Sequence, residues 1–171
     1  VYQETQEQIE DLIPEGAIGP DTRLVLANAI YFKADWVHQF LPVLTRDMPF
    51  NLLDGGQKST PMMNFEQPRQ LGYLAGDSFQ AVELPYVGDQ ISMLVLVPDQ
   101  GKFVDFEDAL TAGKLDTIWG ALEQRTVSLV FPKFSFTRNF SLDKTLSQMG
   151  MPDAFCSGAT DFSGIDGKGV L

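Results

Sequence analysis

The side chains that most often perform catalysis are scarce in this chain. His38 is the single histidine and Cys156 the single cysteine. A serine or cysteine nucleophile needs a histidine nearby as its base, so any such site would have to include His38. His38 lies in a polar stretch without a catalytic motif, and Cys156 lacks the flanking residues expected of a nucleophile. We therefore expect a surface histidine and a structural thiol rather than a catalytic pair.

Ligand sets for metals and phosphates are also missing from the sequence. Metal sites need several convergent ligands, and one histidine with one cysteine leaves only scattered carboxylates. The segment 161–167 lacks the alternating acids of a calcium loop, and the glycines of 164–169 match neither a Walker A nor a dinucleotide-binding spacing. Glu107 and Asp108 are adjacent, so on a helix they point apart and form a solvated face. We predict no catalytic residue, no bound metal and no cofactor.

The charge of the chain limits the class of its partners. Its 171 residues carry a formal net charge of -11, and 44% of them are hydrophobic. An acidic surface repels nucleic acid and anionic lipid, and no basic run offsets this charge. The apolar run 24–32 is too short to span a bilayer, and no signal-peptide pattern begins the chain. We expect a soluble protein of one domain that binds neither nucleic acid nor membrane.

One polar side chain interrupts the apolar stretch LVLANAIYFKADW, residues 24–36. The continuous apolar run predicts a strand over 24–32 that is buried on both faces. Asn28 lies inside it, and a buried carboxamide costs about 1–3 kcal/mol if its hydrogen bonds are unmet. Either the fold supplies partners for Asn28, or Asn28 lies near a strand end and reaches water. The pattern by itself favours neither.

The rest of the pattern predicts short helices among consecutive strands. Helices are expected over 1–13, over 107–124 with Thr111 as a possible cap, and around Leu142, Leu146 and Met149 up to Gly150. Besides 24–32, strands are expected in two pieces of 71–84 split at Gly76-Asp77, over 91–97, and over 127–136 with Pro132 as an interruption. Residues 52–56 predict a turn. Because strands often follow one another directly, we predict an α+β fold with mainly antiparallel sheets.

A series of short sequence blocks runs in order along nearly the whole chain. The blocks are Thr5, Ile9, Leu12 and Ile13; NAIYFKADW at 28–36, then Phe40, Thr45 and Phe50; PMM at 61–63; ELPY at 83–86 with Gly88; SMLVLVPD at 92–99; LT at 110–111; PKF at 132–134; MGM at 149–151 with Ala154-Phe155; and DFSGI at 161–165. In this order they resemble the middle of a serpin, a member of the serine protease inhibitor superfamily. Glu7 and Thr160 depart from the family pattern, but both departures are local.

The resemblance implies a multi-sheet α+β fold. In it, this chain supplies part of sheet A, parts of sheets B and C, and short helices. It implies a partial serpin domain over 1–171 that lacks the N-terminal helices and the C-terminal reactive loop region, so that the reactive-site bond lies outside this chain. A segment of this kind exposes the edge and the apolar faces of a central strand, and we expect it to aggregate when it is produced alone.

The resemblance also implies inhibition without a catalytic residue or a cofactor. A target serine protease, or alternatively a cysteine protease, cleaves the reactive loop and is held as an acyl-enzyme, and the loop then inserts as a new strand into sheet A. We expect the intact protein to be monomeric and extracellular, with a cytoplasmic protein as the alternative. A non-inhibitory serpin that acts as a carrier or chaperone remains the second reading. A hydrolase or binding domain in which His38 or the carboxylates converge in a pocket is the third.

Three residues receive roles from the resemblance. Asn28 matches the asparagine of the family's "shutter", whose serine and histidine partners lie outside this chain. Trp36 matches the tryptophan of the "breach", where loop insertion begins. Lys133 matches a lysine that in some members pairs with an acid at the base of the reactive loop. The alternative is an ordinary core position for Trp36 and an ordinary surface position for Lys133.

The triplet Asn139-Phe140-Ser141 matches a glycosylation sequon, but a triplet is short enough to arise by chance.

Overall fold

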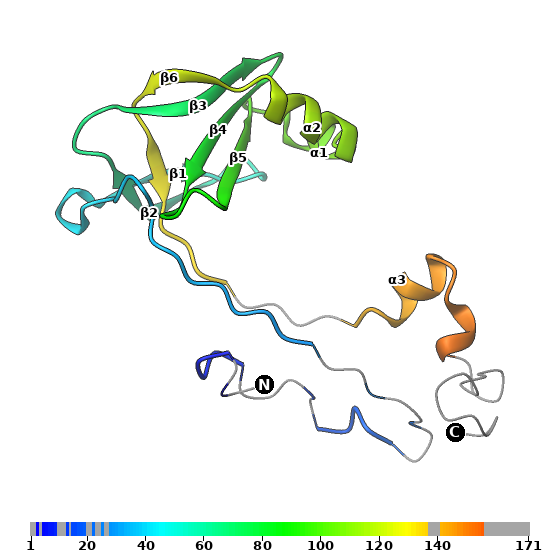
Figure 1. Ribbon diagram of the computed structural model, residues 1–171. Helices are drawn as coiled ribbons and strands as arrows, with labels where there is room; N and C mark the ends of the chain where they lie inside the picture. The colour runs from blue at the N-terminus through cyan, green and yellow to red at the C-terminus, as the bar shows by residue number, and fades with distance from the viewer. Residues whose placement is uncertain are drawn as a thin grey trace. The chain divides into compact units, whose positions relative to one another are not determined.

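The structure, a computed structural model, describes residues 3, 5–9, 13, 15–19, 22, 25, 28–136 and 141–155 (Figure 1). By its internal contacts the chain divides into two compact units. We name Lys33–Ser135 the sheet unit, and Val1–Phe32 together with Phe136–Leu171 the terminal unit. Trp36 and Lys133 therefore belong to the sheet unit, and Asn28 belongs to the terminal unit.

The sheet unit contains two antiparallel sheets. Its described strands are β1 (Arg46–Asn51), β2 (Gln57–Asn64), β3 (Arg69–Gly76), β4 (Phe79–Pro85), β5 (Ser92–Pro98), β6 (Glu123–Val127) and β7 (Val130–Pro132). The strand order is β1-β2-β7 in one sheet and β5-β4-β3-β6 in the other, and a short 3-10 helix, η1 (Pro42–Leu44), precedes β1. Each neighbouring pair is antiparallel, as the direct succession of strands predicts. The α+β fold class is confirmed.

The β3–β4 hairpin confirms the two strands expected within 71–84. Gly76 and Asp77 lead into the turn, where Ser78 has a φ of 64°. Gly76 also lies against the aromatic ring of Phe79, because a Cβ atom on Gly76 would be 2.2 Å from the Cε1 atom of that ring. Glycine is the residue that fits this close approach, which explains why the apolar pattern breaks here.

Two short helices, α1 (Phe103–Asp108) and α2 (Ala112–Gly120), follow β5. The Thr111 hydroxyl accepts a hydrogen bond from the Lys114 N–H at 3.2 Å, so the predicted cap is confirmed. The single helix expected over 107–124 is wrong in its bounds. Thr111 has extended backbone angles, with φ -126° and ψ 163°, and therefore separates α1 from α2.

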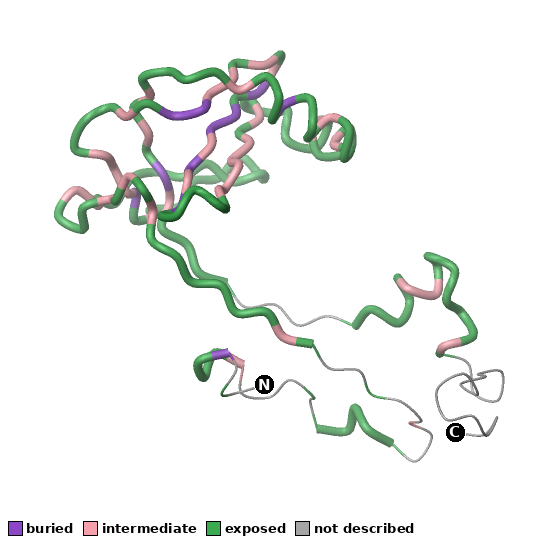
Figure 2. The backbone as a smooth tube through the Cα atoms, viewed as in Figure 1, coloured by how far each residue is buried: buried purple, intermediate pink, exposed green. Residues whose placement is uncertain are grey.

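Apolar side chains are buried on both faces of the four-stranded sheet. One cluster consists of Leu71, Val82 and Leu84, and the other of Phe79, Ala81 and Ile118. Successive side chains of a strand point to opposite faces, so Ala81 and Val82 belong to different clusters. Figure 2 shows the buried segments along the strands and in α2. Ile118 anchors α2 on one face, and the other face is left for the residues around Trp36.

The polar strand β6 does not follow from the hydrophobic pattern. Its sequence, EQRTV, is mostly exposed, and the strand pairs with β3 between Arg69 and Tyr73. β7 pairs instead with β2 in the other sheet. The single interrupted strand expected over 127–136 is therefore wrong. The chain leaves one sheet after Val127 and enters the other at Val130.

In the terminal unit the described residues contain one α-helix, α3 (Asp143–Gln148), and the 3-10 helix η2 (Pro152–Phe155). Gly150 has a φ of 105°, and the following N–H, that of Met151, donates to the Leu146 carbonyl at 3.0 Å. A left-handed glycine therefore ends this helical segment where the sequence predicts it. Asn139, Cys156 and residues 157–171 lie outside the described residues.

The helix expected over 1–13 is not observed in the residues of that range that the structure describes. Turns occupy the residues around Thr5, and Gln6 and Glu7 have positive φ values of 52° and 65°. Two consecutive left-handed residues interrupt the right-handed helical path. A short amphipathic helix gains most of its stability from the surface it packs on, so its periodicity alone does not determine the structure.

Candidate functional site

Backbone hydrogen bonds attach segment 35–37 to the last residue of β4 and to the residues that follow it. An isolated antiparallel β-bridge pairs Trp36 with Tyr86. Its two hydrogen bonds run from the Val37 N–H to the Pro85 carbonyl at 3.0 Å and from the Val87 N–H to the Asp35 carbonyl at 2.8 Å. Trp36 is therefore held through its backbone at the end of a core strand.

The side chain of Trp36 adds a ring stack to this bridge. Its indole lies 4.3 Å from the ring of Tyr86, centroid to centroid, with 16° between the planes. On another side Phe40 meets Trp36 edge-on, with centroids 6.5 Å apart and an interplanar angle of 89°. Aromatic pairs in these geometries contribute about 0.5–1.5 kcal/mol each beyond the area that they bury. Trp36 is half-buried and packs against the core cluster of Leu71.

Further rings extend the contact from Trp36 to both sheets. What we name the aromatic cluster consists of Trp36, His38, Phe40, Phe65, Tyr86 and Phe131. Phe40 stacks on Phe65 with centroids 4.5 Å apart, and its centroid lies 6.2 Å from that of Phe131. Phe131 is part of β7, whereas Tyr86 follows β4. The aromatic cluster therefore joins the two sheets of the sheet unit.

The aromatic cluster is packed as a structural joint and is not a ligand pocket. The space bordered by Trp36, His38, Phe40, Leu71, Leu84 and Pro85 leaves no room for a water molecule. Leu71 and Leu84, on its core side, are 2% and 3% exposed. Because the rings leave no space between them, Trp36 cannot change its position unless its neighbours Phe40 and Tyr86 move too.

His38 belongs to this joint, and the expected surface position of its imidazole is met only in part. The ring is half-buried and meets Phe65 edge-on, with centroids 6.3 Å apart and an angle of 76°. An apolar neighbour neither orients an imidazole as a carboxylate does nor offers it a proton to remove. Within the described ranges, no group of three His, Cys, Asp or Glu side chains could hold a metal ion.

Lys133 lies beside the aromatic cluster in sequence but presents its side chain to solvent. Its backbone N–H donates to the Pro61 carbonyl at 2.8 Å, which extends the pairing of β7 with β2 past Pro132. The next ring, Phe134, meets Phe131 edge-on at 6.1 Å. The backbone of Lys133 is therefore fixed while its ammonium group remains accessible to a carboxylate.

Asn28 is exposed, and the buried strand expected over 24–32 is wrong for its described residues. Residues 28–32 belong to neither sheet, and Ile30 is 84% exposed. A strand is buried on both faces only when neighbouring strands and covering layers enclose it, and none of the described strands pairs with this segment. The structure therefore brings the surroundings of Trp36 and Lys133 together in the sheet unit, whereas Asn28 belongs to the terminal unit.

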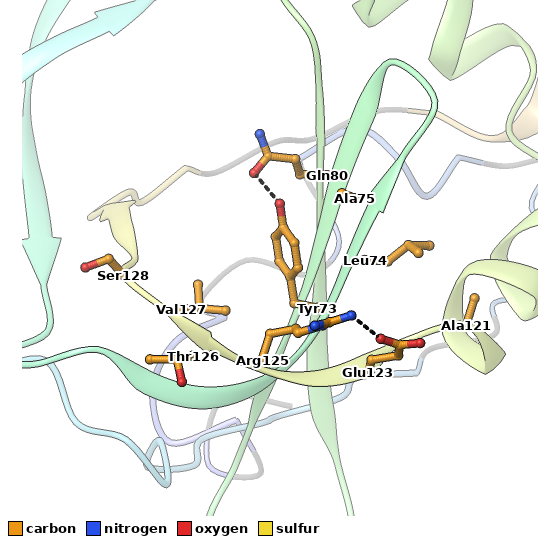
Figure 3. Close-up of a pocket in the computed structure, with 10 residues that line it drawn as sticks. All are labelled: Tyr73, Leu74, Ala75, Gln80, Ala121, Glu123, Arg125, Thr126, Val127 and Ser128. Carbon is orange, nitrogen blue, oxygen red and sulfur yellow. Dashed lines mark hydrogen bonds and ion pairs between the residues drawn. The ribbon is translucent and has the colours of Figure 1, made fainter.

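A separate cavity of about 570 Å³ lies over β3, β4 and β6 (Figure 3). The Tyr73 hydroxyl donates to Gln80 Oε1 at 3.0 Å, and the Arg125 guanidinium binds the Glu123 carboxylate at 2.6 Å. The Arg125 and Glu123 side chains are 64% and 67% exposed, so their ion pair contributes little to stability. The residues that line the cavity include no histidine and no cysteine, and they form no pair of nucleophile and base.

Nothing in the sequence indicates a role for the ring partners of Trp36. Tyr86 belongs to the ELPY block and directly follows the end of β4, but nothing in the local pattern pairs it with a residue fifty positions earlier. Phe65 and Phe131 are ordinary apolar residues in the sequence. A useful signal is the occurrence of single aromatic residues just after predicted strands, where side chains from different elements meet.

None of the helices in the described ranges has the length and apolar character of a membrane-spanning helix.

Comparison with known proteins gives matches along the whole chain. The family model described as Serpin (serine protease inhibitor) matches residues 1–171. Human Serpin B9 is 36% identical over 172 residues, which cover 98% of this chain and 46% of that protein. The chain spans less than half the length of the first curated relatives that it matches, from 37% to 46% of each.

Solved serpin structures share the fold. Ovalbumin from the emu, Dromaius novaehollandiae, matches with a TM-score of 0.84 and 28% identity over 91% of this chain and 41% of its own. Human thyroxine-binding globulin, cleaved in its reactive loop, matches with a TM-score of 0.81 and 26% identity over 96% of this chain and 48% of its own. The sequence blocks, the family match and the shared fold lead to one conclusion: this chain belongs to the serpin family and covers part of the serpin domain.

Proposed function

We propose that the full-length protein inhibits a serine protease as a suicide substrate, by insertion of its reactive loop. The observation that carries the proposal is the match of residues 1–171 to a family described as serine protease inhibitors. Among the described residues, His38 packs edge-on against Phe65, which fits a protein whose reaction uses the catalytic residues of its target. The bond that the protease would cleave lies outside this chain in the proposal.

The joint at Trp36 has a defined task in this mechanism. Residues 28–35 run directly into Trp36, and in the proposal they belong to the strand beside which the loop inserts. The bridge and the ring stack with Tyr86 hold the end of that strand to β4. The reactive loop would then begin to insert beside the end of this strand that the joint holds to β4. The stability of the joint would therefore control the rate at which insertion starts.

Asn28 and Lys133 complete the proposed switch. Asn28 would act as a polar latch once neighbouring strands enclose it, because an amide inside a sheet must be satisfied by specific partners. Lys133 would pair with an acid at the base of the reactive loop. Its fixed backbone and accessible ammonium group suit this role.

We also propose that the intact protein is an extracellular monomer, with a cytoplasmic location as the alternative.

A non-inhibitory carrier is the second candidate. It is supported by the fold shared with thyroxine-binding globulin, a protein whose name states that it binds thyroxine. A carrier needs a cavity of ligand size, and the cavity over β3, β4 and β6 falls in the range of small-molecule sites, about 300–1,000 Å³. In this reading the reactive loop is cleaved without trapping the protease.

The two candidates are separated by incubating the full-length protein with a trypsin-like and a chymotrypsin-like protease. Inhibition by this mechanism gives a covalent complex that survives denaturing electrophoresis. A protease whose catalytic serine is replaced by alanine is the matched control, because it binds the loop but forms no acyl-enzyme. Cleavage of the loop by every protease tested, with no complex, would contradict the inhibitory proposal and favour the carrier.

A further inference from the structure

The loop between β1 and β2 carries an aspartate that has no part in the inhibitory scheme. The loop comprises residues 52–56 and is closed by two backbone hydrogen bonds. The Leu52 N–H donates to the Gly56 carbonyl at 2.8 Å, and the Gly55 N–H donates to the Leu52 carbonyl at 3.1 Å. Asp54, at the tip, is exposed, as are both glycines that follow it. Water therefore reaches the side chain and the peptide group beside it.

The carboxylate of Asp54 is folded forward along the chain. Its Oδ1 atom accepts a hydrogen bond from the Gly56 N–H at 2.8 Å. A Cβ atom on Gly56 would lie 3.0 Å from Oδ1 and 3.7 Å from the carboxyl carbon Cγ. The side chain of Asp54 is therefore bent toward the backbone of Gly56, and the hydrogen bond limits its rotation while it remains exposed to water.

Gly55 directly follows Asp54, so its backbone nitrogen is the one whose attack on Cγ closes a five-membered ring, and it has no side chain to hinder the approach. The space around the position of a Cβ on Gly55 is empty to 4 Å, and its φ is 84°. Glycine also allows the rotation that brings its nitrogen against Cγ, once the bond to Leu52 opens. Every other aspartate in the described ranges is followed by a residue with a side chain.

We propose that Asp54-Gly55 is a site of spontaneous isoaspartate formation. The Gly55 nitrogen attacks Cγ of the protonated Asp54 carboxyl group, and the N–Cγ bond forms a five-membered succinimide. The amide proton and the carboxyl hydroxyl leave together as water. Water then adds to one of the two ring carbonyls. Opening at Cγ restores aspartate, whereas opening at the main-chain carbonyl leaves the chain running through the side-chain carboxyl. The reaction consumes no oxidant and no co-reactant other than water.

Isomerisation would change the hairpin, because isoaspartate adds one atom to the backbone of a loop with fixed hydrogen bonds. The pair of bonds between Leu52, Gly55 and Gly56 cannot both be kept in a longer loop. Among the described strands, β1 pairs with β2 alone. Loosening this end of the hairpin would therefore expose more of Met48 and Phe50, which are already 39% and 41% exposed.

The test follows the full-length protein during prolonged incubation under native conditions at neutral pH and physiological temperature. Peptide mapping with electron-transfer fragmentation separates isoaspartate from aspartate at each position, and methyl transfer by a protein isoaspartyl methyltransferase measures the total. Isoaspartate is expected to accumulate at Asp54 several-fold faster than at Asp77. Asp77 is a matched control because it is also exposed at a hairpin turn, but Ser78 follows it. Equal conversion at the two positions would overturn the proposal.

Three variants test the chemistry and the geometry. Asp54→Asn should react faster through the same succinimide, because a neutral carboxamide needs no protonation before the attack, with ammonia leaving in place of water. Asp54→Glu should stop the reaction because its ring would be six-membered. Gly56→Ala keeps the Asp-Gly step but places a methyl group against Oδ1, and should slow the reaction. An unchanged rate in Gly56→Ala would overturn the role of the folded carboxylate. Isomerisation at position 54 in Asp54→Glu at the rate of the parent would overturn the succinimide mechanism.

Discussion

The indole of Trp36 and the phenol ring of Tyr86 lie nearly parallel, 4.3 Å apart between centroids and 16° between planes. Tyr86 is 9% exposed and fixed to the end of β4, and two backbone hydrogen bonds flank the stacked pair. A residue of the segment 28–36 is thereby attached to the core of the four-stranded sheet. In the proposed mechanism, this attachment fixes the end of the strand formed by residues 28–35, beside which the reactive loop begins to insert.

Loss of the Tyr86 ring should destabilise the sheet unit more than loss of its hydroxyl. Tyr86→Ala is expected to lower the free energy of unfolding of the full-length protein by about 3–5 kcal/mol, as for other buried aromatic side chains cut to alanine. Tyr86→Phe keeps the stack with Trp36 and should cost at most about 1.5 kcal/mol. Urea unfolding followed by circular dichroism measures both. Similar losses in the two variants would show that the ring stack does not stabilise the fold.

In the proposed mechanism, the joint also controls how long the full-length protein stays active as an inhibitor. In Trp36→Ala the strand end loses its ring contacts with Tyr86 and Phe40, so conversion to an inactive, loop-inserted form should be faster. The active fraction, titrated with the target protease after warming, is expected to fall more rapidly than in the parent. Trp119→Ala is the control, because Trp119 lies on α2 and is 47% exposed. The same decay in both variants would argue against a specific role of the joint.

Two glycines should respond to alanine in opposite directions. In Gly76→Ala the new methyl group would lie 2.2 Å from the Phe79 ring, which must move out of a buried position. We expect a loss of about 1–3 kcal/mol, the usual cost of overpacking. Gly113 lies in α2 with no atom within 4 Å of its Cβ position, so Gly113→Ala should stabilise the protein by about 0.5–1 kcal/mol. Chemical denaturation tests both, and destabilisation by Gly113→Ala would contradict this account.

The sequence predicts those helices and hairpins whose backbone is determined by residues a few positions apart. The β3–β4 hairpin depends on Gly76 and its neighbours, and α2 depends on Thr111 and on an apolar spacing that places Ile118 toward the sheet. The end of α3 follows from Gly150. In each case residues a few positions apart determine the backbone, so a pattern in the sequence is enough to locate the element.

Sequence patterns miss or misassign those elements whose structure depends on residues far away in the chain. β6 is polar and is a strand because its backbone pairs with β3, some fifty residues earlier in the chain. The run 24–32 looks like a buried strand, but its apolar side chains do not supply the neighbours that such a strand requires. For the same reason the roles of Trp36 and Lys133 came from the serpin resemblance. The contact of Trp36 with Tyr86 came only from the structure, because no local pattern encodes it.

The cap of α2 should have a measurable effect because the helix is short. Thr111→Ala removes the acceptor for the Lys114 N–H and is expected to cost about 0.5–2 kcal/mol. Thr111→Ser keeps the hydroxyl and should come within about 0.5 kcal/mol of the parent. Thermal unfolding of the two variants at equal concentration gives the comparison. A serine variant as unstable as the alanine variant would mean that the lost contact is that of the threonine methyl group.

The pKa of Asp143 reports directly on the start of α3. The Ser141 hydroxyl donates to the Asp143 carboxylate at 2.7 Å, and this bond, followed by the Lys144 N–H, lowers the pKa of Asp143 below its ordinary value of 3.8. A group whose pKa is lower in the folded state stabilises the fold above the unfolded-state pKa, and this contribution is lost as the pH falls through the folded-state pKa.

Ser141→Ala should therefore raise the pKa of Asp143 in an NMR titration of its carboxyl carbon. Ser147→Ala is the matched control, because the Ser147 hydroxyl binds the backbone carbonyl of Asp143 and should leave this pKa nearly unchanged. Equal shifts in the two variants would indicate that fraying of the helix, and not the loss of the Ser141 hydrogen bond, changes the titration.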